Sequence, residues 1–290
     1  MDLLPFDYAP LALAFVQVAL GIAVLIIAKL SLGWLSPYST NQELTARDNP
    51  AFGLAIAGYY VGTVIVYLGA TASLPLPLED GAKAVLLALA GDAGWSLAGV
   101  IALNVSRWLM DRFLIIGIRN DREITERRNL AAGALECGAY IAAGVVLAGA
   151  IRQPGGTLWN ATALFLLGQC VLILMGHVYQ RWIGYDVAAA IRSSNLAGGL
   201  AFAMTLVALA ILMLKAISGE FISWVANLSF FAVDAIAGLI LLMFLRWITD
   251  LALLPHSRPA DEIVRDRNVN VGLIEGTLAI GIATIILFLF

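Results

Sequence analysis

The sequence predicts an all-α, polytopic membrane protein whose eight transmembrane helices form two parallel four-helix repeats. Hydrophobic residues make up 61% of the 290 residues and charged residues only 13%, so the chain has too little charge for the surface of a soluble domain. A helix needs about 20 apolar residues to cross the hydrocarbon layer of a bilayer. Eight such segments can be marked, at roughly 8–33, 49–73, 82–110, 129–151, 158–183, 195–216, 220–248 and 269–290.

The even-numbered segments begin with a shared pattern. Asn49 precedes Pro50, and Gly53 follows four residues after the Asn. An Asn side chain accepts hydrogen bonds from the free N–H groups of a first helical turn, and Pro fits the first helical position. The same Asn and Gly recur in each even-numbered segment, which predicts a common helix start and packing face. The residues concerned are Asn49, Gly53, Asn129, Gly133, Asn195, Gly199, Asn268 and Gly272.

The odd-numbered segments agree with one another at the ends that lead into these loops. A Trp lies close to each of these ends, and in three of the four cases an Arg precedes it. Because the indole ring prefers the headgroup level of a bilayer, we expect these residues to be interfacial anchors. They are Trp34, Trp108, Trp182 and Trp247.

Larger identities divide the chain into two repeats. Arg107, Trp108 and Asp111 recur with the same spacing as Arg246, Trp247 and Asp250, and the stretch 123–136 recurs as 262–275. We read four copies of a two-helix unit, joined into repeats at 1–151 and 152–290. An even number of spans in each repeat gives both repeats the same orientation, so their pseudo-two-fold axis should follow the membrane normal.

Basic residues are concentrated on one side of this predicted topology. If the N-terminus lies outside, the inner loops and the adjoining helix ends hold 14 of the 17 Lys and Arg residues. Cytoplasmic loops of membrane proteins carry such an excess. We therefore expect both termini to lie outside, on the periplasmic side.

One motif carries a family resemblance. The pattern E-[LI]-x-x-x-x-N, with a Gly four residues after the Asn, occupies 43–53, 123–133 and 262–272. The chain thereby resembles the YjfL-type family of bacterial membrane proteins of unknown function, in which a unit of about four helices is often duplicated. The resemblance covers the whole chain as two copies and implies a bacterial inner-membrane location. The segment that begins at Asn195 departs from the motif, because Ala189 replaces the Glu.

Acidic residues inside the apolar segments are the candidates for function. A charged carboxylate at a bilayer centre costs about 2.5–3.5 kcal/mol, so an acid placed there needs compensation or a role. The nearest basic residues, Lys29, Arg107 and Arg246, lie near segment ends, where their side chains can extend to the headgroups. We therefore expect an acidic core without bases. The candidate residues are Asp92, Glu136, Asp234 and Glu275.

Two interpretations of these acids are open. In the structural one, Glu136 and Glu275 are protonated and hydrogen-bonded between helices. In the functional one, the two glutamates pair where equivalent helices of the two repeats meet, and they form a proton or small-cation pathway. Either way we expect a non-enzymatic protein with no cofactor, no metal and no nucleic-acid partner, since no nucleotide, phosphate, zinc or haem motif occurs.

A second hypothesis concerns the charged loops at 111–128 and 250–267. Both carry charges of both signs and could form short interfacial helices. Their recurrence favours a packing role or the docking of a cytoplasmic partner. The resemblance to the YjfL-type family, which is associated with envelope-stress proteins, implies a scaffold of that type. We expect the lipid bilayer and a homo-oligomer as its other contacts.

Overall fold

The computed structural model describes residues 9–36, 38–72, 77–151, 157–253 and 258–289. Residues 1–8 of the first predicted repeat, residue 73 of the second span, residues 152–156 of the second repeat, part of the loop 250–267 (254–257) and residue 290 lie outside this range. Within the described residues the chain is helical and contains no strand. The predicted all-α class is therefore confirmed.

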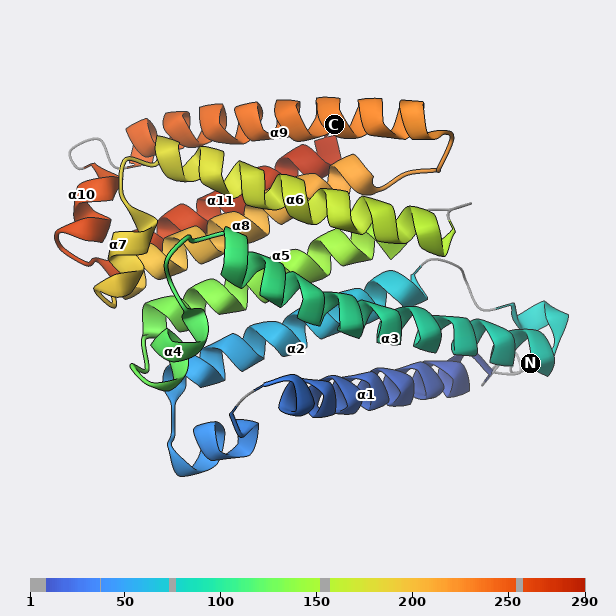
Figure 1. The fold of residues 1–290 in the computed structure, drawn as a ribbon. Helices are drawn as coiled ribbons and strands as arrows, with labels where there is room; N and C mark the ends of the chain where they lie inside the picture. Colours follow the sequence, from blue (N-terminus) through green and yellow to red (C-terminus); the bar gives the residue numbers. More distant parts are fainter. Residues whose placement is uncertain (1–8, 37, 73–76, 152–156, 254–257, 290) are drawn as a thin grey trace, which may run out of the picture.

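Eight helices are long and apolar enough to cross a membrane, as predicted (Figure 1). Their bounds are α1 Ala9–Leu35, α2 Pro50–Thr71, α3 Ala82–Phe113, α5 Leu130–Ile151, α6 Leu158–Trp182, α8 Leu196–Ile217, α9 Trp224–Leu253 and α11 Val269–Leu289. Short helical turns lie between them: η1 Gln42–Ala46, η2 Leu78–Asp80, α4 Asn120–Thr125, α7 Val187–Arg192 and α10 Pro259–Val264. The protein is a multi-pass membrane protein whose outward-facing apolar side chains contact lipid.

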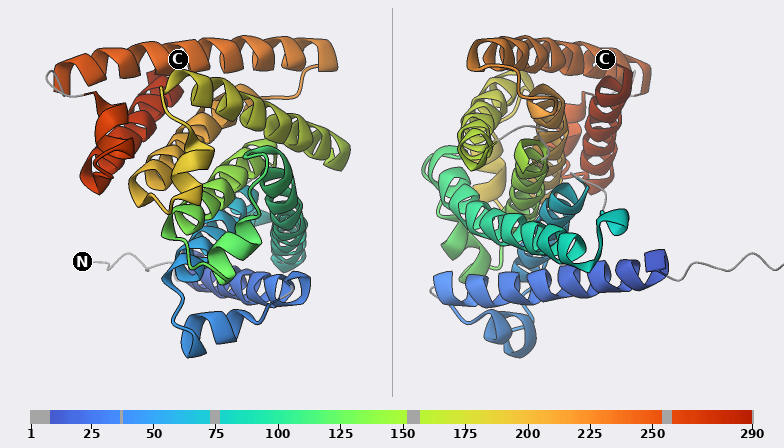
Figure 2. Two further views of the ribbon diagram at one scale, coloured as in Figure 1. Left: turned by 60° about the vertical axis from the view of Figure 1, so that its left-hand side comes forward. Right: turned by 90° about the vertical axis from the view of Figure 1, so that its right-hand side faces the viewer.

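The long helices form an inner row and an outer set. The inner row runs α2, α5, α8, α11, each helix packing on the next, and the outer helices are α1, α3, α6 and α9. Helix α3 covers the junction of α2 and α5, α6 covers that of α5 and α8, and α9 covers that of α8 and α11. Figure 2 shows α1 and α9 on opposite sides of the bundle. The four inner helices are therefore the core.

Small residues let the inner helices approach closely and in one register. A Cβ added at Gly199 of α8 would lie 2.6 Å from the carbonyl oxygen of Ala131 on α5, and one at Gly272 of α11 would lie 2.6 Å from that of Ala197 on α8. Gly133 of α5 meets Ala51 of α2 in the same way. In each case the Gly four residues after one motif Asn packs on the Ala two residues after the preceding motif Asn. Backbones can meet this closely only where no side chain intervenes.

The loops before the inner helices share one conformation, and we call them the cap loops. The residue before each motif Asn has a positive φ, namely Asp48, Arg128, Ser194 and Arg267, with values between 45° and 54°. The Asn that follows caps its helix. For example, Asn49 Oδ1 accepts from Phe52 N–H at 3.2 Å and Asn195 Oδ1 accepts from Gly198 N–H at 3.4 Å. All four cap loops lie at one end of the bundle, which we call the cap end.

The cap loops also bond successive copies to one another. Asn49 Nδ2 donates to the carbonyl oxygen of Ile124 at 2.9 Å, and Asn129 Nδ2 donates to that of Ile191 at 2.7 Å. Asn195 Nδ2 donates to that of Ile263 at 2.8 Å. Each acceptor lies in the short helix that precedes the next inner helix. The Asn side chain of one copy thus donates a hydrogen bond to a backbone carbonyl oxygen of the following copy.

The motif glutamate completes this arrangement. Glu43 Oε2 accepts from Asn49 Nδ2 at 3.0 Å, Glu123 Oε2 from Asn129 Nδ2 at 2.8 Å, and Glu262 Oε2 from Asn268 Nδ2 at 3.1 Å. In the E-[LI]-x-x-x-x-N motif the glutamate therefore accepts a hydrogen bond from the asparagine six residues later and so holds the cap loop closed. The short helices α4 and α10 bury Ile124 and Ile263 against the bundle, so the recurrence of the two charged loops has a structural explanation.

We predict that Asn129→Ala destabilises the fold more than Asn268→Ala. The first change removes a helix cap and the side-chain donor to the Ile191 carbonyl oxygen, which keeps the Ser194 N–H at 2.9 Å, so we expect a loss of about 1.5–3 kcal/mol. The second change also removes a helix cap, but the Asn268 amide donates only to Glu262 of the same copy. We therefore expect the free energy of unfolding to fall by about 1 kcal/mol. Denaturant titration of the two purified variants in one detergent measures the difference. Equal midpoints would contradict a role for the bond between copies.

Candidate functional site

The structure separates the two candidate glutamates. Glu136 lies on α5 and Glu275 on α11, and α8 packs between those helices. The predicted pairing of the glutamates at the repeat axis is wrong, because the inner helices form a row in which the fourth and eighth spans are not neighbours. Each glutamate instead turns toward the outer helix that precedes it.

Glu136 meets a base and a second acid at the end of α3. Its Oε1 lies 3.3 Å from Arg107 Nε, and Asp111 Oδ2 lies 3.8 Å from the same nitrogen. The Glu136 side chain is only 6% exposed and that of Asp111 28%. The expectation of an acidic core without bases is therefore wrong. The Arg107 side chain turns into the bundle, toward the buried Glu136 carboxylate, and is only 15% exposed.

Both terminal nitrogens of Arg107 also donate hydrogen bonds. Nη2 donates to Tyr38 Oη at 2.7 Å and Nη1 to Ser36 Oγ at 3.4 Å, while the guanidinium carbon lies 5.9 Å from the centre of the Tyr38 ring. Burial raises the pKa of the Tyr38 phenol, so the hydroxyl stays neutral and accepts from Arg107. The guanidinium is thereby held in one orientation.

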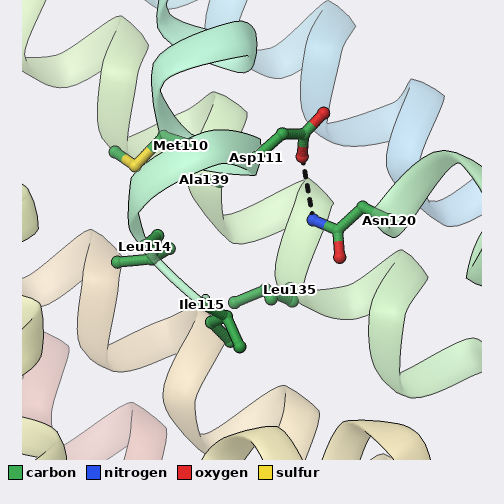
Figure 3. A pocket seen from close by; sticks show the side chains of 7 residues that line it. All are labelled: Met110, Asp111, Leu114, Ile115, Asn120, Leu135 and Ala139. Atoms are coloured by element: carbon green, nitrogen blue, oxygen red, sulfur yellow. Dashed lines mark hydrogen bonds between the residues drawn. The ribbon is translucent and has the colours of Figure 1, made fainter. Parts of the chain in front are cut away.

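Asn120, at the start of α4, joins the two acids. Its Nδ2 donates to Asp111 Oδ1 at 2.9 Å and to Glu136 Oε2 at 3.1 Å. Figure 3 shows the Asn120 amide pointing directly at the Asp111 carboxyl, with both side chains in the lining of a small pocket. Arg107, Asp111, Asn120 and Glu136 form what we call the first cluster: two carboxyl groups that share one guanidinium and one amide.

Space for water adjoins the first cluster. A cavity of about 10 Å³ touches Asp111, Asn120 and Ala139 (Figure 3), and a second of about 10 Å³ touches Arg107, Glu136 and Tyr140. Each is about the size that one water needs. A cleft of about 920 Å³ between α1, α3 and α4 is lined in part by Arg107, Asp111 and Asn120. The first cluster is therefore open toward the surface at the cap end.

The second repeat holds a more enclosed counterpart, the second cluster. Arg246 on α9 forms an ion pair with Glu275 on α11, and its Nη1 donates to Thr205 Oγ1 at 3.3 Å. The guanidinium carbon lies 5.3 Å from the centre of the Tyr179 ring. Asp250, the counterpart of Asp111, interacts electrostatically with Arg246 and Glu275. The Arg246 side chain is only 4% exposed, against 15% for Arg107, so the guanidinium of this cluster is the more deeply buried of the two.

The other two candidate acids lie elsewhere. Asp92 on α3 and Asp234 on α9 are each ten residues from the start of their helix, or about 15 Å along its axis. Both are partly exposed, and neither side chain has a hydrogen-bond or ion-pair partner among the described residues. They share no site with each other or with either glutamate, so each is placed near the middle of a span on its own.

The polar surroundings of these two acids differ. On α3, Asp92, Ser96, Asn104 and Arg107 fall on about one third of the helix circumference. Asn104 Nδ2 donates to Tyr59 Oη at 3.1 Å. On α9, residues 235–245 between Asp234 and Arg246 are all apolar. A polar stripe thus follows α3 from mid-span toward the first cluster, and α9 has no counterpart between these two residues.

Sequence reasoning missed Arg107, Asp111, Asn120 and Tyr38 as members of the site. A signal was present for two of them, since Arg107 and Asp111 recur as Arg246 and Asp250 together with the glutamates. Nothing in the local sequence points to Asn120 or Tyr38. They reach the cluster from segments that only the fold brings beside it.

The four Trp residues predicted as interfacial anchors lie in the last two turns of the odd-numbered spans or close to them. Trp34, Trp108 and Trp247 are exposed at the ends of α1, α3 and α9. Trp182 is partly buried and lies 5.7 Å from the Tyr179 ring, centre to centre.

Cys137 and Cys170 are free thiols. Among the described residues, no group of three or more His, Cys, Asp or Glu side chains could hold a metal ion.

Comparison with known proteins gives a family. The chain matches the family described as a Domain of Unknown Function (DUF350) twice, over residues 6–151 and 155–289. The chain belongs to this family and contains two copies of its domain, which confirms the resemblance to a duplicated membrane family of unknown function. No curated protein and no solved structure matches the chain.

Proposed function

We propose that this duplicated membrane domain is a non-enzymatic protein that moves protons across the bilayer, with the first cluster as its exchange site. The observation that carries the proposal is that Asp111 and Glu136 share one guanidinium and one amide beside an open cleft. Two carboxylates and one arginine hold one excess negative charge when all three are ionised. One proton neutralises that excess.

The chemistry favours a proton over a bare cation. Two carboxylates placed close together repel each other, and a proton bound by either one removes that repulsion. Arg107 repels a metal cation, whereas a proton needs only a carboxylate oxygen to accept it. The small-cation version of the pathway, which followed from an acidic core without bases, loses its main support.

The route proposed for the first repeat begins at the cap end. Water in the cleft reaches Asp111 and Asn120, and the two water-sized cavities extend this contact to Glu136. The polar stripe on α3 continues toward Asp92 at mid-span. The sequence predicts a pathway that uses Glu136 and Glu275 together. The deeper burial of Arg246 and the apolar stretch on α9 favour Glu136 for transport and Glu275 for stability.

Proton flux into liposomes tests the proposal. With the purified protein in vesicles that contain a pH-sensitive dye, Glu136→Gln is expected to abolish proton entry under an imposed potential. Asp92→Asn is expected to slow it. Glu43→Gln is the matched control, because Glu43 is a buried glutamate at the same end that pairs with Arg47 at 2.7 Å and lies outside the proposed route.

Three outcomes would contradict transport through the first cluster. Wild-type vesicles could be no more permeable than empty ones, Glu136→Gln could conduct like wild type, or Glu43→Gln could fail as completely as Glu136→Gln. The Glu275→Gln variant, measured per folded protein, separates the two versions of the pathway. Full flux places transport in the first repeat alone, and loss of flux restores the paired-glutamate version.

We further propose a bacterial inner-membrane location with both termini on the periplasmic side. The cap end carries most of the basic residues, including Arg119, Arg122 and Arg127 of the α4 loop, and positively charged ends face the cytoplasm. Alkaline phosphatase fused after residue 290 is expected to be active, and the same enzyme fused within the loop 111–128 to be inactive. The reverse pattern would invert the topology.

A scaffold that binds a cytoplasmic partner remains the second candidate. Charged side chains of both signs are exposed on the α4 loop, with Arg119 64%, Arg122 59% and Glu126 69% exposed. Arg122→Ser with Glu126→Ser is expected to remove a copurifying partner and leave proton flux unchanged. Unchanged copurification would count against docking at this loop.

A further inference from the structure

The inner row of helices is open at both of its ends. Within the chain, each inner helix lies in a groove made by the next copy: α2 between α3 and α5, α5 between α6 and α8, and α8 between α9 and α11. The same kind of interface therefore occurs three times. Within residues 9–289, as far as the structure describes them, no copy packs on α11 as the next one would, and none packs between α1 and α2 as a preceding one would.

The three interfaces use equivalent positions, counted from the motif Asn. Nine residues after its Asn, Gly58 of α2 packs on Cys137 of α5, which lies eight residues after the next Asn. Gly138 of α5 packs on Ala203 of α8 with the same counts. Met204 of α8 packs on Gly276 of α11, again at nine and eight. One set of positions faces the following copy and another faces the preceding copy.

The receiving groove of the first copy is open. A groove of about 450 Å³ lies between α1 and α2 and is lined by apolar side chains together with Tyr60 and Lys29. Tyr60 and Val64 in its wall correspond to Tyr140 and Gly144 of α5, which contact α2. A Cβ added at Gly53 would meet only a Leu44 methyl group, at 4.0 Å, whereas the equivalent glycines meet backbone.

The entering face of the last copy is also open. Thr277 and Gly281 lie nine and thirteen residues after Asn268, and both are exposed. A Cβ at Gly281 would have no atom within 4 Å, whereas one at the equivalent Gly62 would lie 2.6 Å from the carbonyl oxygen of Tyr140. The Asn268 amide bonds Glu262 of its own loop, while the three earlier motif amides reach the next copy.

We infer that a second copy of this chain binds head to tail, with α11 of one copy in the α1–α2 groove of the next. The interface continues the one that occurs three times within the chain, which is why the occupant is this chain and not an unrelated helix. Thr277 then meets Ala57, and Gly281 meets the backbone at Tyr60. Asn268 Nδ2 donates to the carbonyl oxygen of Leu44, the residue that corresponds to Ile124 and Ile263.

Such an interface joins two different faces. It closes into a ring if the rotation between copies returns to its start, and it otherwise extends as an open row. A two-fold dimer, in which one face meets itself, is excluded by this arrangement. That difference makes the inference testable by cross-linking.

Cysteine cross-linking between differently tagged chains is the test. In a background with Cys137→Ala and Cys170→Ala, chains with Ala57→Cys are mixed with chains with Thr277→Cys in lipid vesicles and oxidised. We expect a disulfide-linked dimer from the mixture and none from either chain alone. Disulfide formation needs Cα atoms about 4.4–6.8 Å apart. The matched control pairs Ala57→Cys with Ile240→Cys, an exposed position on α9, and should give none.

A packing variant gives a second readout. Gly281→Leu is expected to shift the wild-type oligomer to monomer on native gels, with helical content unchanged. Gly94→Leu, on α3, is the matched control, since a Cβ there also meets no atom within 4 Å, and its assembly should match wild type. The inference is overturned by a monomeric wild type in lipid, by a mixture that links no better than the control pair, or by a single-cysteine chain that links to itself.

Discussion

Replacing Glu275 with Ala is expected to destabilise the protein by about 3–5 kcal/mol, because it leaves the Arg246 charge buried without its carboxylate. The Arg246 side chain is 4% exposed, so water cannot substitute for the lost partner. The double variant Arg246→Met with Glu275→Leu removes both charges. It should recover most of the lost free energy of unfolding, since apolar side chains of similar volume can fill the buried site without a desolvation cost. The free energies of unfolding of the wild type, the Glu275→Ala variant and the double variant can be compared by titration in mixed detergent.

The first cluster provides the comparison for that experiment. Glu136→Ala should cost less than Glu275→Ala: a second acid remains near the arginine in both variants, but Arg107 is 15% exposed against 4% for Arg246, and the cleft beside Arg107 admits water. A larger loss for Glu136→Ala, or a double variant no better than Glu275→Ala, would show that burial of the Arg246 charge does not control stability.

Gly199→Leu is expected to separate α5 from α8 and to destabilise the protein by about 3 kcal/mol or more. A Cβ at this position would lie 2.6 Å from the Ala131 carbonyl oxygen and 2.7 Å from its Cα. Backbone cannot move aside as a flexible side chain can, so the whole helix must shift. Thermal unfolding, followed by circular dichroism, measures the effect.

Gly94→Leu is the control for this packing prediction as well. The site is in a span helix and faces open space, so the change in helix propensity is similar and the steric conflict is absent. If both variants melt at the same temperature, close approach of α5 and α8 does not hold the two repeats together.

Much of this fold could be predicted from the sequence because its signals are local. Apolar segment length fixes the eight spans, and the spacing of Asn49 and Gly53, repeated at Asn195 and Gly199, identifies equivalent helix starts. Both signals depend on residues within one or two turns of each other. A membrane adds a strong constraint, since a spanning segment must satisfy its backbone within itself.

The site could not be predicted so completely because it depends on which helices are neighbours. Equivalence of the fourth and eighth spans is compatible with a symmetric pair or with a row, and the row places α8 between Glu136 and Glu275. The position of Arg107 near the end of its span suggested an exposed charge. Its pairing with Glu136 follows from the tilt and packing of α3 on α5, which residue spacing within either helix does not encode.

The hydrogen bonds between cap loops also determine the order in which the loops can be completed during synthesis. Asn49 needs the carbonyl of Ile124, Asn129 that of Ile191, and Asn195 that of Ile263, and each acceptor leaves the ribosome after its donor. During synthesis, therefore, the cap loop of each of the first three copies is completed only after the following copy has been made, as in linear arrays whose stability depends on nearest neighbours. In a nascent chain stopped after α8, the Asn49 and Asn129 amides could form their hydrogen bonds to the next copy, whereas the Asn195 amide would still lack the Ile263 carbonyl as its acceptor.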